Sequence, residues 1–385
     1  MKNINVLCAT DRNFLYPTYV TMISVIKNHP QMHVRFFLIV DKDLSADDLN
    51  KLKEFIESRN ATIEFLRIDI DDFDGFEISE RFTKAAYFRL MAHKYLPKSL
   101  DRILYLDVDI VVNADISEFY FEEFGDKYLL ATSHNPVPDY YNTLDSTTVN
   151  LEAAGKGEFF NSGVLVFNLR KFRENITADD YVSAYEKCLN NDIKVFYDQG
   201  LLNYMFFDKT RYFSSMDYNY RYSIPIDYKR RIDQDKRYKK AIIHYTGMKQ
   251  PYKPWDIIFN EEEIQLFGNV PYDNNYFYVS ESLNDLMKIW WEYAKYTPVY
   301  DELLQQEQVK HKWFSRNLMP LLMRLNSIQQ HNNVKICYKD KPRKQIVEVY
   351  PKDFKHRAYK LGCVILSPFY FVRKVFRNLK KKKSR

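Results

Sequence analysis

The sequence lacks the motifs of three common kinds of site: a phosphate-binding loop, a dinucleotide-binding loop and a site built from paired cysteines. Glycine is scarce, at nine residues in 385, and no GxxxxGK[ST] phosphate loop occurs. The nearest approach to a dinucleotide fingerprint, Gly155-x-Gly157, has Phe160 where a third small residue belongs. No two of the four cysteines stand in a CxxC spacing, so neither a zinc site nor a disulfide framework is indicated. The cysteines are Cys8, Cys188, Cys337 and Cys363.

Long apolar runs are also missing. The N-terminal segment reaches Asp11 before any apolar core typical of a secretory signal. Near the C-terminus, the uncharged stretch 361–372 has 12 residues, fewer than the roughly 20 that a membrane-spanning helix needs. We therefore expect a cytoplasmic protein in a reducing compartment.

The composition is that of a folded globular protein, with 46% hydrophobic and 16% aromatic residues. The net charge is +6, but residues 354–385 contain 11 Lys or Arg and no acidic residue, which leaves −5 for the rest. An acidic body with a basic tail indicates that the tail meets a polyanionic surface.

Strand-like and helical patterns alternate over the first 250 residues. Strands are expected at 3–9, 34–40, 62–68, 102–107, 128–133, 162–168 and 239–246, and helices near Pro17 and at 45–59, 83–96 and 178–190. This alternation predicts an α/β fold with a mostly parallel central sheet and helices on both faces. Beyond Trp255 the pattern is mainly helical, most clearly at 282–296. We expect three parts: a catalytic domain at 1–255, a helical extension at 256–353 and a basic amphipathic tail at 354–385.

Two carboxylates interrupt the apolar run at 102–116. Asp107 and Asp109 are two residues apart, so an extended chain would present both side chains to one spot. Two bare carboxylates repel each other and burial opposes their ionisation, so a divalent cation is the simplest partner. The alternative is that they end a strand by accepting hydrogen bonds from backbone or arginine.

His244, at the end of the 239–246 strand, is a candidate third ligand, although a histidine there is also commonly a core or surface residue. The segment that follows, HYTGMKQPYKPW, places Gly247 and two lysines in a short loop suited to a polyphosphate. Two carboxylates and an imidazole favour Mn²⁺, with Mg²⁺ as the second choice, because harder ions prefer shells made only of oxygen.

Further polar residues stand where strands and helices meet. Asp11 and Asn13 follow the first strand, where they could bind a nucleoside or simply cap the next helix. Arg89 lies on the helix before the two aspartates and could form a structural ion pair or reach a ligand. The pattern alone also reads 161–163 as a turn and 198–199 as a helix N-terminus.

Taken together, these segments resemble the family-8 retaining glycosyltransferases, a group that includes bacterial lipopolysaccharide galactosyltransferases and glycogenin. The matching motifs lie in order between residues 4 and 255: INVLCATDRNF, AAYFRL, LYLDVDIVV, FFNSGVLVFNL, YDQGLLN and HYTG…KPW. The resemblance implies a GT-A fold, a bound Mn²⁺ and UDP-glucose or UDP-galactose as donor. It also implies transfer of the hexose to a hydroxyl of a glycan or glycolipid acceptor.

Roles for individual residues follow from the same resemblance. Asp107, Asp109 and His244 would ligate the metal; Ala9, Thr10, Asp11, Asn13 and Val108 would bind the nucleotide; Gly247 and Lys253 would contact the diphosphate; and Arg89, Asn161, Asp198 and Gln199 would line the sugar. One departure is a three-residue insertion between Gly247 and the lysine, so Lys249 could replace Lys253. Retention requires a covalent intermediate or front-face attack. Because no suitable carboxylate pair is evident and the amide of Gln199 is a weak nucleophile, we favour front-face attack.

The tail has a separate prediction. In 367–385, apolar residues fall on one helical face among basic ones, as in helices that lie on anionic membranes. The alternative is a disordered basic tail. No nucleic-acid partner is expected, because the basic residues are confined to this tail. Two rival functions remain: a haloacid-dehalogenase-type phosphatase, which also uses a DxD after a strand, and a catalytically silent nucleotide-sugar or membrane-binding protein.

Overall fold

The computed structural model describes residues 2–67, 76, 87–133, 160–191, 197–213, 216–221, 239–246, 253–255 and 281–317. The chain divides into two compact units. The first comprises Met1–Thr246 and Leu286–Leu303, and the second comprises Gly247–Asp285 and Leu304–Arg385. The predicted domain boundaries at 255 and 353 stay predictions.

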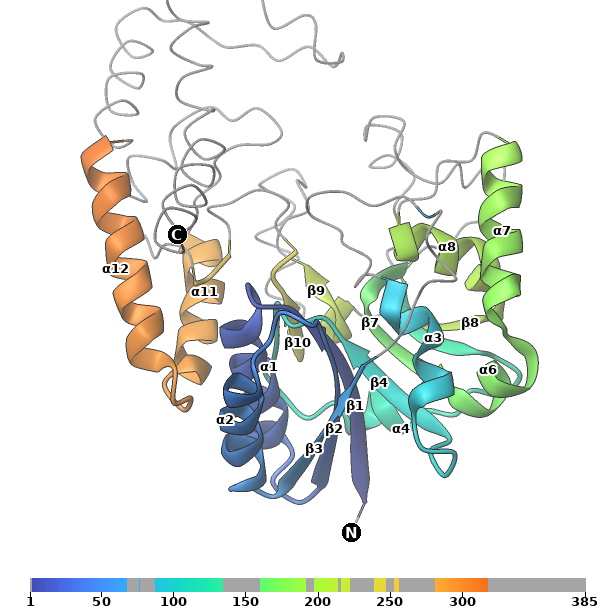
Figure 1. Cartoon of the computed structure of the whole chain (residues 1–385), viewed down its shortest axis with the longest axis horizontal. Helices are drawn as coiled ribbons and strands as arrows, with labels where there is room; N and C mark the ends of the chain where they lie inside the picture. The colour runs from blue at the N-terminus through green and yellow to red at the C-terminus, as the bar shows by residue number, and fades with distance from the viewer. Residues whose placement is uncertain are drawn as a thin grey trace, which may run out of the picture. The chain divides into compact units, whose positions relative to one another are not determined.

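A seven-stranded sheet forms the centre of the first unit, with strand order β3-β2-β1-β4-β7-β6-β8 (Figure 1). Its strands are β1 Asn3–Thr10, β2 His33–Val40, β3 Ala61–Leu66, β4 Arg102–Leu106, β6 Leu129–Ser133, β7 Phe160–Asn168 and β8 Thr210–Phe213. β7 runs antiparallel to both of its neighbours, whereas the other four pairings are parallel. The predicted α/β architecture with a mostly parallel sheet is confirmed.

Helices cover both faces of this sheet, with α1 and α2 on one side and α3, α6, α7 and α8 on the other (Figure 1). The helices of this unit are α1 Leu15–Asn28, α2 Ala46–Glu57, α3 Phe88–Tyr95, α4 Ser117–Phe121, α6 Leu169–Asn175, α7 Ala178–Asn190 and α8 Tyr197–Phe206. Leu7, Phe37 and Tyr105 are buried in one cluster with apolar residues of α3, α6, α7 and α8. Strand side chains alternate between faces, so both faces need apolar residues, which explains the nearly unbroken apolar strands.

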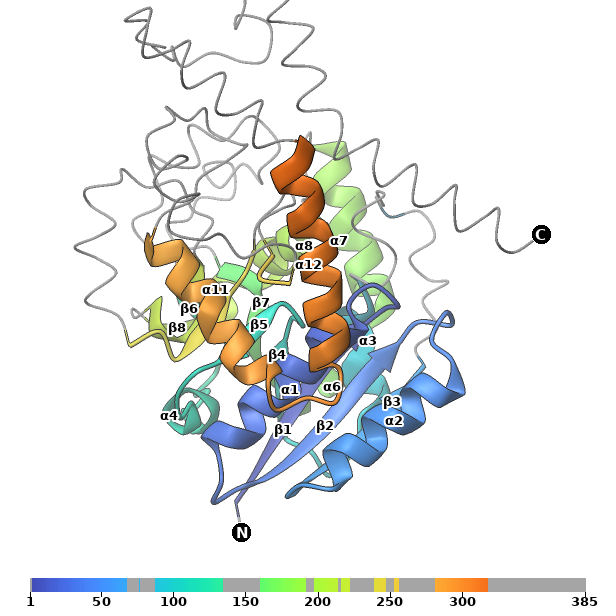
Figure 2. The same ribbon diagram turned by 90° about the vertical axis from the view of Figure 1, so that its left-hand side faces the viewer.

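Local sequence signals define α2 well. The Ser45 hydroxyl accepts a hydrogen bond from Asp48 N, and the Asp48 side chain accepts one from Ser45 N, which completes a capping box. The buried residues Leu49, Leu52 and Ile56 recur at helical spacing. α2 lies beside β3 in both views (Figures 1 and 2).

A second, three-stranded sheet has the order β5-β10-β9, built from β5 Ile110–Val112, β9 Tyr220–Arg221 and β10 Ile242–His244. The apolar run at 102–116 is divided between the two sheets. The strand predicted at 102–107 is found as β4, which ends at Leu106, and the residues that follow form β5 in the other sheet. Asp107, Val108 and Asp109 therefore form the link between two sheets.

The remaining described elements are α11 Glu281–Ala294 and α12 Tyr300–Asn317, with 3-10 turns at Phe207–Lys209 and Met216–Tyr218. α11 confirms the helix predicted at 282–296, and its C-terminal part joins the first unit, where Tyr293 Oη accepts a hydrogen bond from Asn28 Nδ2 at 2.8 Å. The start of the 83–96 helix, residues 256–280 and the tail at 354–385 lie outside the described residues. None of the described helices is both long enough and apolar enough to cross a bilayer.

Candidate active site

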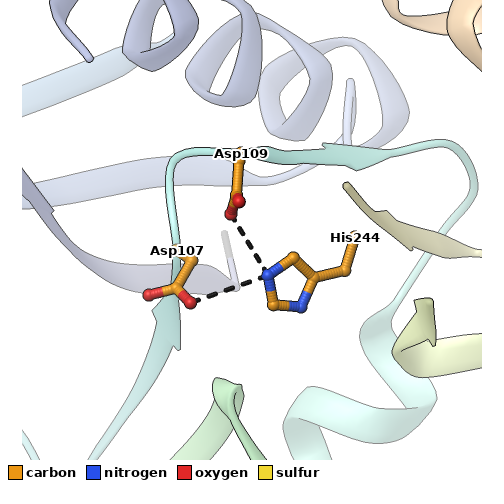
Figure 3. A group of neighbouring side chains, drawn as sticks. All are labelled: Asp107, Asp109 and His244. Atoms are coloured by element: carbon orange, nitrogen blue, oxygen red, sulfur yellow. Dashed lines mark ion pairs between the residues drawn. The ribbon is translucent and has the colours of Figure 1, made fainter. Parts of the chain in front are cut away.

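Three predicted ligands converge at one edge of the central sheet. The parallel strands β1 and β4 end at this edge, and β7, which is antiparallel to β4, begins there. Asp107 follows β4 directly, Asp109 precedes β5, and His244 is the last residue of β10 (Figure 3). The antiparallel pairing of β10 with β5 sets His244 opposite Ile110, next to Asp109.

The imidazole of His244 faces both carboxylates. Its Nε2 lies 3.1 Å from Asp109 Oδ1 and 3.6 Å from Asp107 Oδ2 (Figure 3). One ligand atom from each of the three residues lies within 4.8 Å of the others. His244 is buried, whereas the two aspartates are partly exposed. The arrangement therefore offers two oxygens and one nitrogen to a common point that solvent can reach.

Asp107 turns only one of its oxygens toward this point. Its Oδ1 accepts a hydrogen bond from Tyr105 Oη at 2.8 Å and lies 3.1 Å from Arg89 Nη2. Its backbone N–H donates to Gly163 O at 2.9 Å. These contacts fix the carboxylate, so Oδ2 is the oxygen directed at His244.

Gly163 provides a direct test of whether the cluster could hold an ion. A Cβ on this residue would lie 2.3 Å from His244 Cε1 and 2.5 Å from Asp107 Oδ2. Only a residue without a side chain can therefore pass here while the ligands keep their positions. The O, O, N donor set suits Mn²⁺, and the residues present fit a divalent cation.

Arg89 is buried and paired on two sides. Its Nε lies 3.2 Å from Asp198 Oδ2, its Nη1 donates to Ser162 O at 2.9 Å, and its guanidinium lies 4.0 Å from the centre of the Tyr105 ring. Burial raises the pKa of Asp198, while Arg89 acts to lower it. Arg89 thus forms the structural ion pairs that the sequence left as one alternative, and these pairs place it at the site.

Gln199 and Asn161 meet beside this pair. The Asn161 Nδ2 and the Ser162 backbone N–H both donate to Gln199 Oε1, at 2.8 Å and 3.2 Å. The stretch 161–163 belongs to strand β7 and is not the turn that the pattern alone indicated. Asp198 and Gln199 lie in the first turn of α8, as the sequence indicated.

The residues assigned to the nucleotide lie at the end of β1 and in the link between sheets. Asp11 Oδ1 accepts from the backbone N–H groups of Asn13 and Phe14, at 2.8 Å and 3.1 Å, which closes a local turn before α1. It is not the helix cap that the sequence offered as an alternative, because the N-cap residue of α1 is Phe14 and no side chain caps it. Thr10 is buried and accepts a hydrogen bond from Thr18, while Ala9 is partly exposed. Val108 is buried and its carbonyl accepts from Thr21 Oγ1 at 3.0 Å. Their nucleotide role stays a prediction.

Of the residues assigned to the diphosphate, Gly247 and Lys249 lie outside the described residues. Lys253 belongs to the second unit, where its Nζ lies 5.8 Å from the centre of the Trp255 ring. Lys310 of the same unit donates to Trp255 O at 2.9 Å.

Tyr105 and Asn219 are among the residues at the site that were not predicted from the sequence. Tyr105 reads as one more apolar strand residue, although its position two before Asp107 is a usable signal, because such residues share a side. Asn219 is fully buried, and its Oδ1 lies 3.1 Å from His244 Nδ1. Nothing in its sequence surroundings distinguishes Asn219, since it contacts His244 only through the fold.

Known proteins resemble this chain in sequence and in fold. Residues 5–259 match the family model for glycosyl transferase family 8. A lipopolysaccharide 1,2-glucosyltransferase of Escherichia coli K12 is 28% identical over 66% of this chain and 74% of its own length. A lipopolysaccharide 1,3-galactosyltransferase of Salmonella typhimurium is 23% identical over 65% of this chain and 73% of its own.

The fold is shared with a solved structure of the galactosyltransferase LgtC in complex with donor and acceptor sugar analogues, at a TM-score of 0.55 and 20% identity. The similarity covers 77% of this chain and 96% of LgtC. The family match spans well over half of the chain and favours a transferase over the phosphatase or silent binding protein that the sequence left open. The chain belongs to glycosyl transferase family 8 and is a glycosyltransferase.

Proposed function

We propose that this enzyme transfers a hexose, glucose or galactose, from a UDP-sugar to a hydroxyl of a glycan or lipid-linked acceptor, with retention at the anomeric carbon and with a divalent metal, preferably Mn²⁺. The observation that carries the proposal is the position of His244 Nε2 between Asp109 Oδ1 and Asp107 Oδ2, next to a glycine that leaves the space open.

Asp107, Asp109 and His244 would hold the metal. When bound, the ion would offset negative charge on the diphosphate as the bond to the sugar breaks. Tyr105 and Arg89 keep one oxygen of Asp107 occupied, so this carboxylate would bind through Oδ2 alone. Charge from a lysine, Lys253 or Lys249, would supplement the metal near Gly247.

The uridine would lie at the end of β1, against Ala9, Thr10, Asp11 and Asn13, with Val108 beside it. This placement is supported by the general rule that open α/β sheets bind ligands at the carboxyl ends of their strands. β1 and β4 are adjacent and parallel, so the nucleotide residues and Asp107 follow neighbouring strand ends.

The sugar would contact Asp198, Arg89, Asn161 and Gln199. Front-face attack is supported by how these side chains are engaged. Asp198 is buried and paired with Arg89, and Gln199 Oε1 already accepts two hydrogen bonds. Neither group is therefore placed as an unencumbered nucleophile, and we assign Asp198 to orienting sugar hydroxyls.

For the acceptor, support comes from the relatives, several of which are named for lipopolysaccharide glycosylation. A cell-envelope glycan or glycolipid is the corresponding proposal. The basic tail at 354–385 would then hold the enzyme on the anionic cytoplasmic face of the membrane.

The test is the Asp109→Ala variant. Removing one of three ligands should abolish transfer from every UDP-hexose at any practical Mn²⁺ concentration, and Mn²⁺ binding measured by calorimetry should be lost. Asp47→Ala is the control, because Asp47 pairs with Lys51 on the exposed surface of α2. Donor choice is measured by Mn²⁺-dependent hydrolysis of a panel of UDP-sugars without acceptor. Near-normal turnover of Asp109→Ala, or no hydrolysis of any UDP-hexose by the unmodified enzyme, would contradict the proposal.

A further inference from the structure

Three amide side chains form a hydrogen-bonded line that starts at His244 and ends with Gln199. His244 Nδ1 lies 3.1 Å from Asn219 Oδ1, Asn219 Nδ2 donates to Asn161 Oδ1 at 3.1 Å, and Asn161 Nδ2 donates to Gln199 Oε1 at 2.8 Å. We call Asn219, Asn161 and Gln199 the amide relay. Asn219 is fully buried, and the other two are partly buried.

The direction of this relay is set by the backbone of β7. An amide side chain can present its oxygen or its nitrogen, but a backbone N–H can only donate. The Ser162 N–H lies 3.2 Å from Gln199, so the Gln199 atom facing it must be the oxygen. The Gly163 N–H lies 3.1 Å from Asn161, so that atom must be oxygen as well.

The rest of the relay follows from these two assignments. With its oxygen toward Gly163, Asn161 turns its nitrogen to Gln199 and can only accept from Asn219. Asn219 therefore donates through Nδ2 and turns its oxygen toward His244. Facing an acceptor, His244 Nδ1 must carry a proton. Nε2 faces the carboxylates of Asp107 and Asp109, which are acceptors as well, so a bound cation would take the place of any proton on Nε2.

We propose that Asn219 is a positioning residue that holds the ring of His244 by accepting from its Nδ1–H and, through Asn161, holds Gln199 with its carbonyl oxygen turned toward β7. A hydrogen bond to the second ring nitrogen commonly fixes the tautomer and orientation of a metal-bound histidine. The same relay leaves the amide nitrogen of Gln199, and not its oxygen, as the group for a substrate oxygen. The metal-binding part of this proposal rests on the proposed function, whereas the proton on His244 Nδ1 does not.

The direct test asks whether His244 Nδ1 is protonated in metal-free protein. Long-range proton–nitrogen spectra of histidine-labelled protein show whether each ring nitrogen carries a proton. The His244→Gln variant identifies the His244 signals among those of the eight histidines. We expect a proton on Nδ1 in the unmodified protein and its loss in Asn219→Leu, in which only Nε2 still faces acceptors. Mn²⁺ affinity of Asn219→Leu should fall about 10–100-fold.

The Asn219→Asp variant tests the contact with His244 and the contact with Asn161 separately. Its carboxylate still accepts from His244 Nδ1, so the proton on Nδ1 and the Mn²⁺ affinity should stay near those of the unmodified protein. Its second oxygen would face Asn161 Oδ1, acceptor against acceptor, so the side-chain amide signals of Asn161 and Gln199 should shift and kcat should fall. This variant also serves if Asn219→Leu does not fold.

Asn28→Leu is the matched control, because Asn28 donates to Val112 O and Tyr293 Oη away from the site. It should lower the melting temperature without removing the proton on His244 Nδ1 or changing Mn²⁺ affinity. An unprotonated His244 Nδ1 in the unmodified protein would overturn the proposal. So would Asn219→Leu with Nδ1 still protonated and the Mn²⁺ affinity of the control, or Asn219→Asp with unchanged Asn161 and Gln199 signals. Because the proton on Nδ1 is read without metal or donor, loss of the proposed function alone would leave this result standing.

Discussion

The turn after β1 and the cluster around His244 lie at the same edge of the sheet, but their polar groups are satisfied in opposite ways. Asp11 accepts from Asn13 and Phe14, both within three residues of it. His244 instead faces Asp109 and Asp107, more than 130 positions earlier in the chain. The comparison teaches that a local turn forms wherever its few residues occur, whereas the cluster forms only when two sheets are assembled.

Substitution of Gly163 should disturb the long-range cluster around His244 most strongly. The Cβ of Gly163→Ala would meet His244 Cε1 at 2.3 Å, so the ligands must move apart. We expect donor turnover to fall about 100-fold and Mn²⁺ binding to weaken, since small misplacements at a site have effects of this size. Overpacking should also lower the free energy of unfolding by about 1–3 kcal/mol. Kinetics, calorimetry and urea unfolding measure the three effects.

Gly125→Ala is the control, because it should lower stability without changing Mn²⁺ affinity. A Cβ there meets nothing within 4 Å, but the backbone φ of 59° disfavours any side chain. The free energy of unfolding should fall by about 1 kcal/mol. Its Mn²⁺ affinity should not change. Equal Mn²⁺ affinities for the two alanine variants would show that Gly163 does not leave space for the ion.

His29 makes a second set of long-range contacts, and its contribution to the free energy of unfolding should depend on pH. His29 Nδ1 lies 2.8 Å from Val25 O, and Ile116 N donates to its Nε2 at 3.1 Å, so the ring joins α1 to the segment after β5 as a neutral imidazole. Burial lowers its pKa below the usual 6.5, against the raising effects of Val25 and Asp115.

This lowered pKa sets the sign of the expected pH effect. Below pH 6.5 the unfolded chain binds more protons at this position than the folded chain does. The contribution of His29 is therefore fully present above this pH and is lost as the pH falls toward the folded pKa. Urea midpoints measured on both sides of pH 6.5 should decrease toward acid, and less so in His29→Gln, which keeps a donor and an acceptor but does not titrate. The same slope in both proteins would exclude His29 as the source.

The smallest effect is expected for a local contact. Ser45→Ala removes one half of the capping box of α2 and should lower the free energy of unfolding by about 1 kcal/mol. Thr177→Ala, at the matching position of α7, should do the same. Neither should change Mn²⁺ affinity, which urea unfolding and calorimetry together would check. A loss of Mn²⁺ binding in either variant would mean that the local and long-range halves are coupled.

Sequence reasoning succeeded where residues act on their near neighbours. The apolar runs predicted β1, β2 and β3, and the Ser45–Asp48 spacing predicted the start of α2. It did not reveal the second sheet, because a continuous apolar run gives no sign that the residues before Asp107 and those after Asp109 pair with different strands. The short strands β8 and β9 were also missed, since two to four residues carry too little pattern.

For the candidate site, the sequence was sufficient to identify the residue types and their order along the chain. Asp107, Asp109 and His244 were selected as possible ligands from chemistry and from the resemblance, and the structure brings them together. The oxygen of Asp107 that faces His244 depends on Tyr105 and Arg89. The direction of the amide relay depends on two backbone N–H groups of β7.

The sequence by itself determined the alternation of strands and helices, the caps and the set of chemical groups available, because these depend on neighbours a few residues apart. Tertiary structure decided which of those groups meet and which atom of each one faces the site. The physical reason is that hydrogen bonds and ion pairs act over about 3 Å, and the pairing of β4 with β7 and of β5 with β10 alone brings Asp107, Gly163 and His244 within that range.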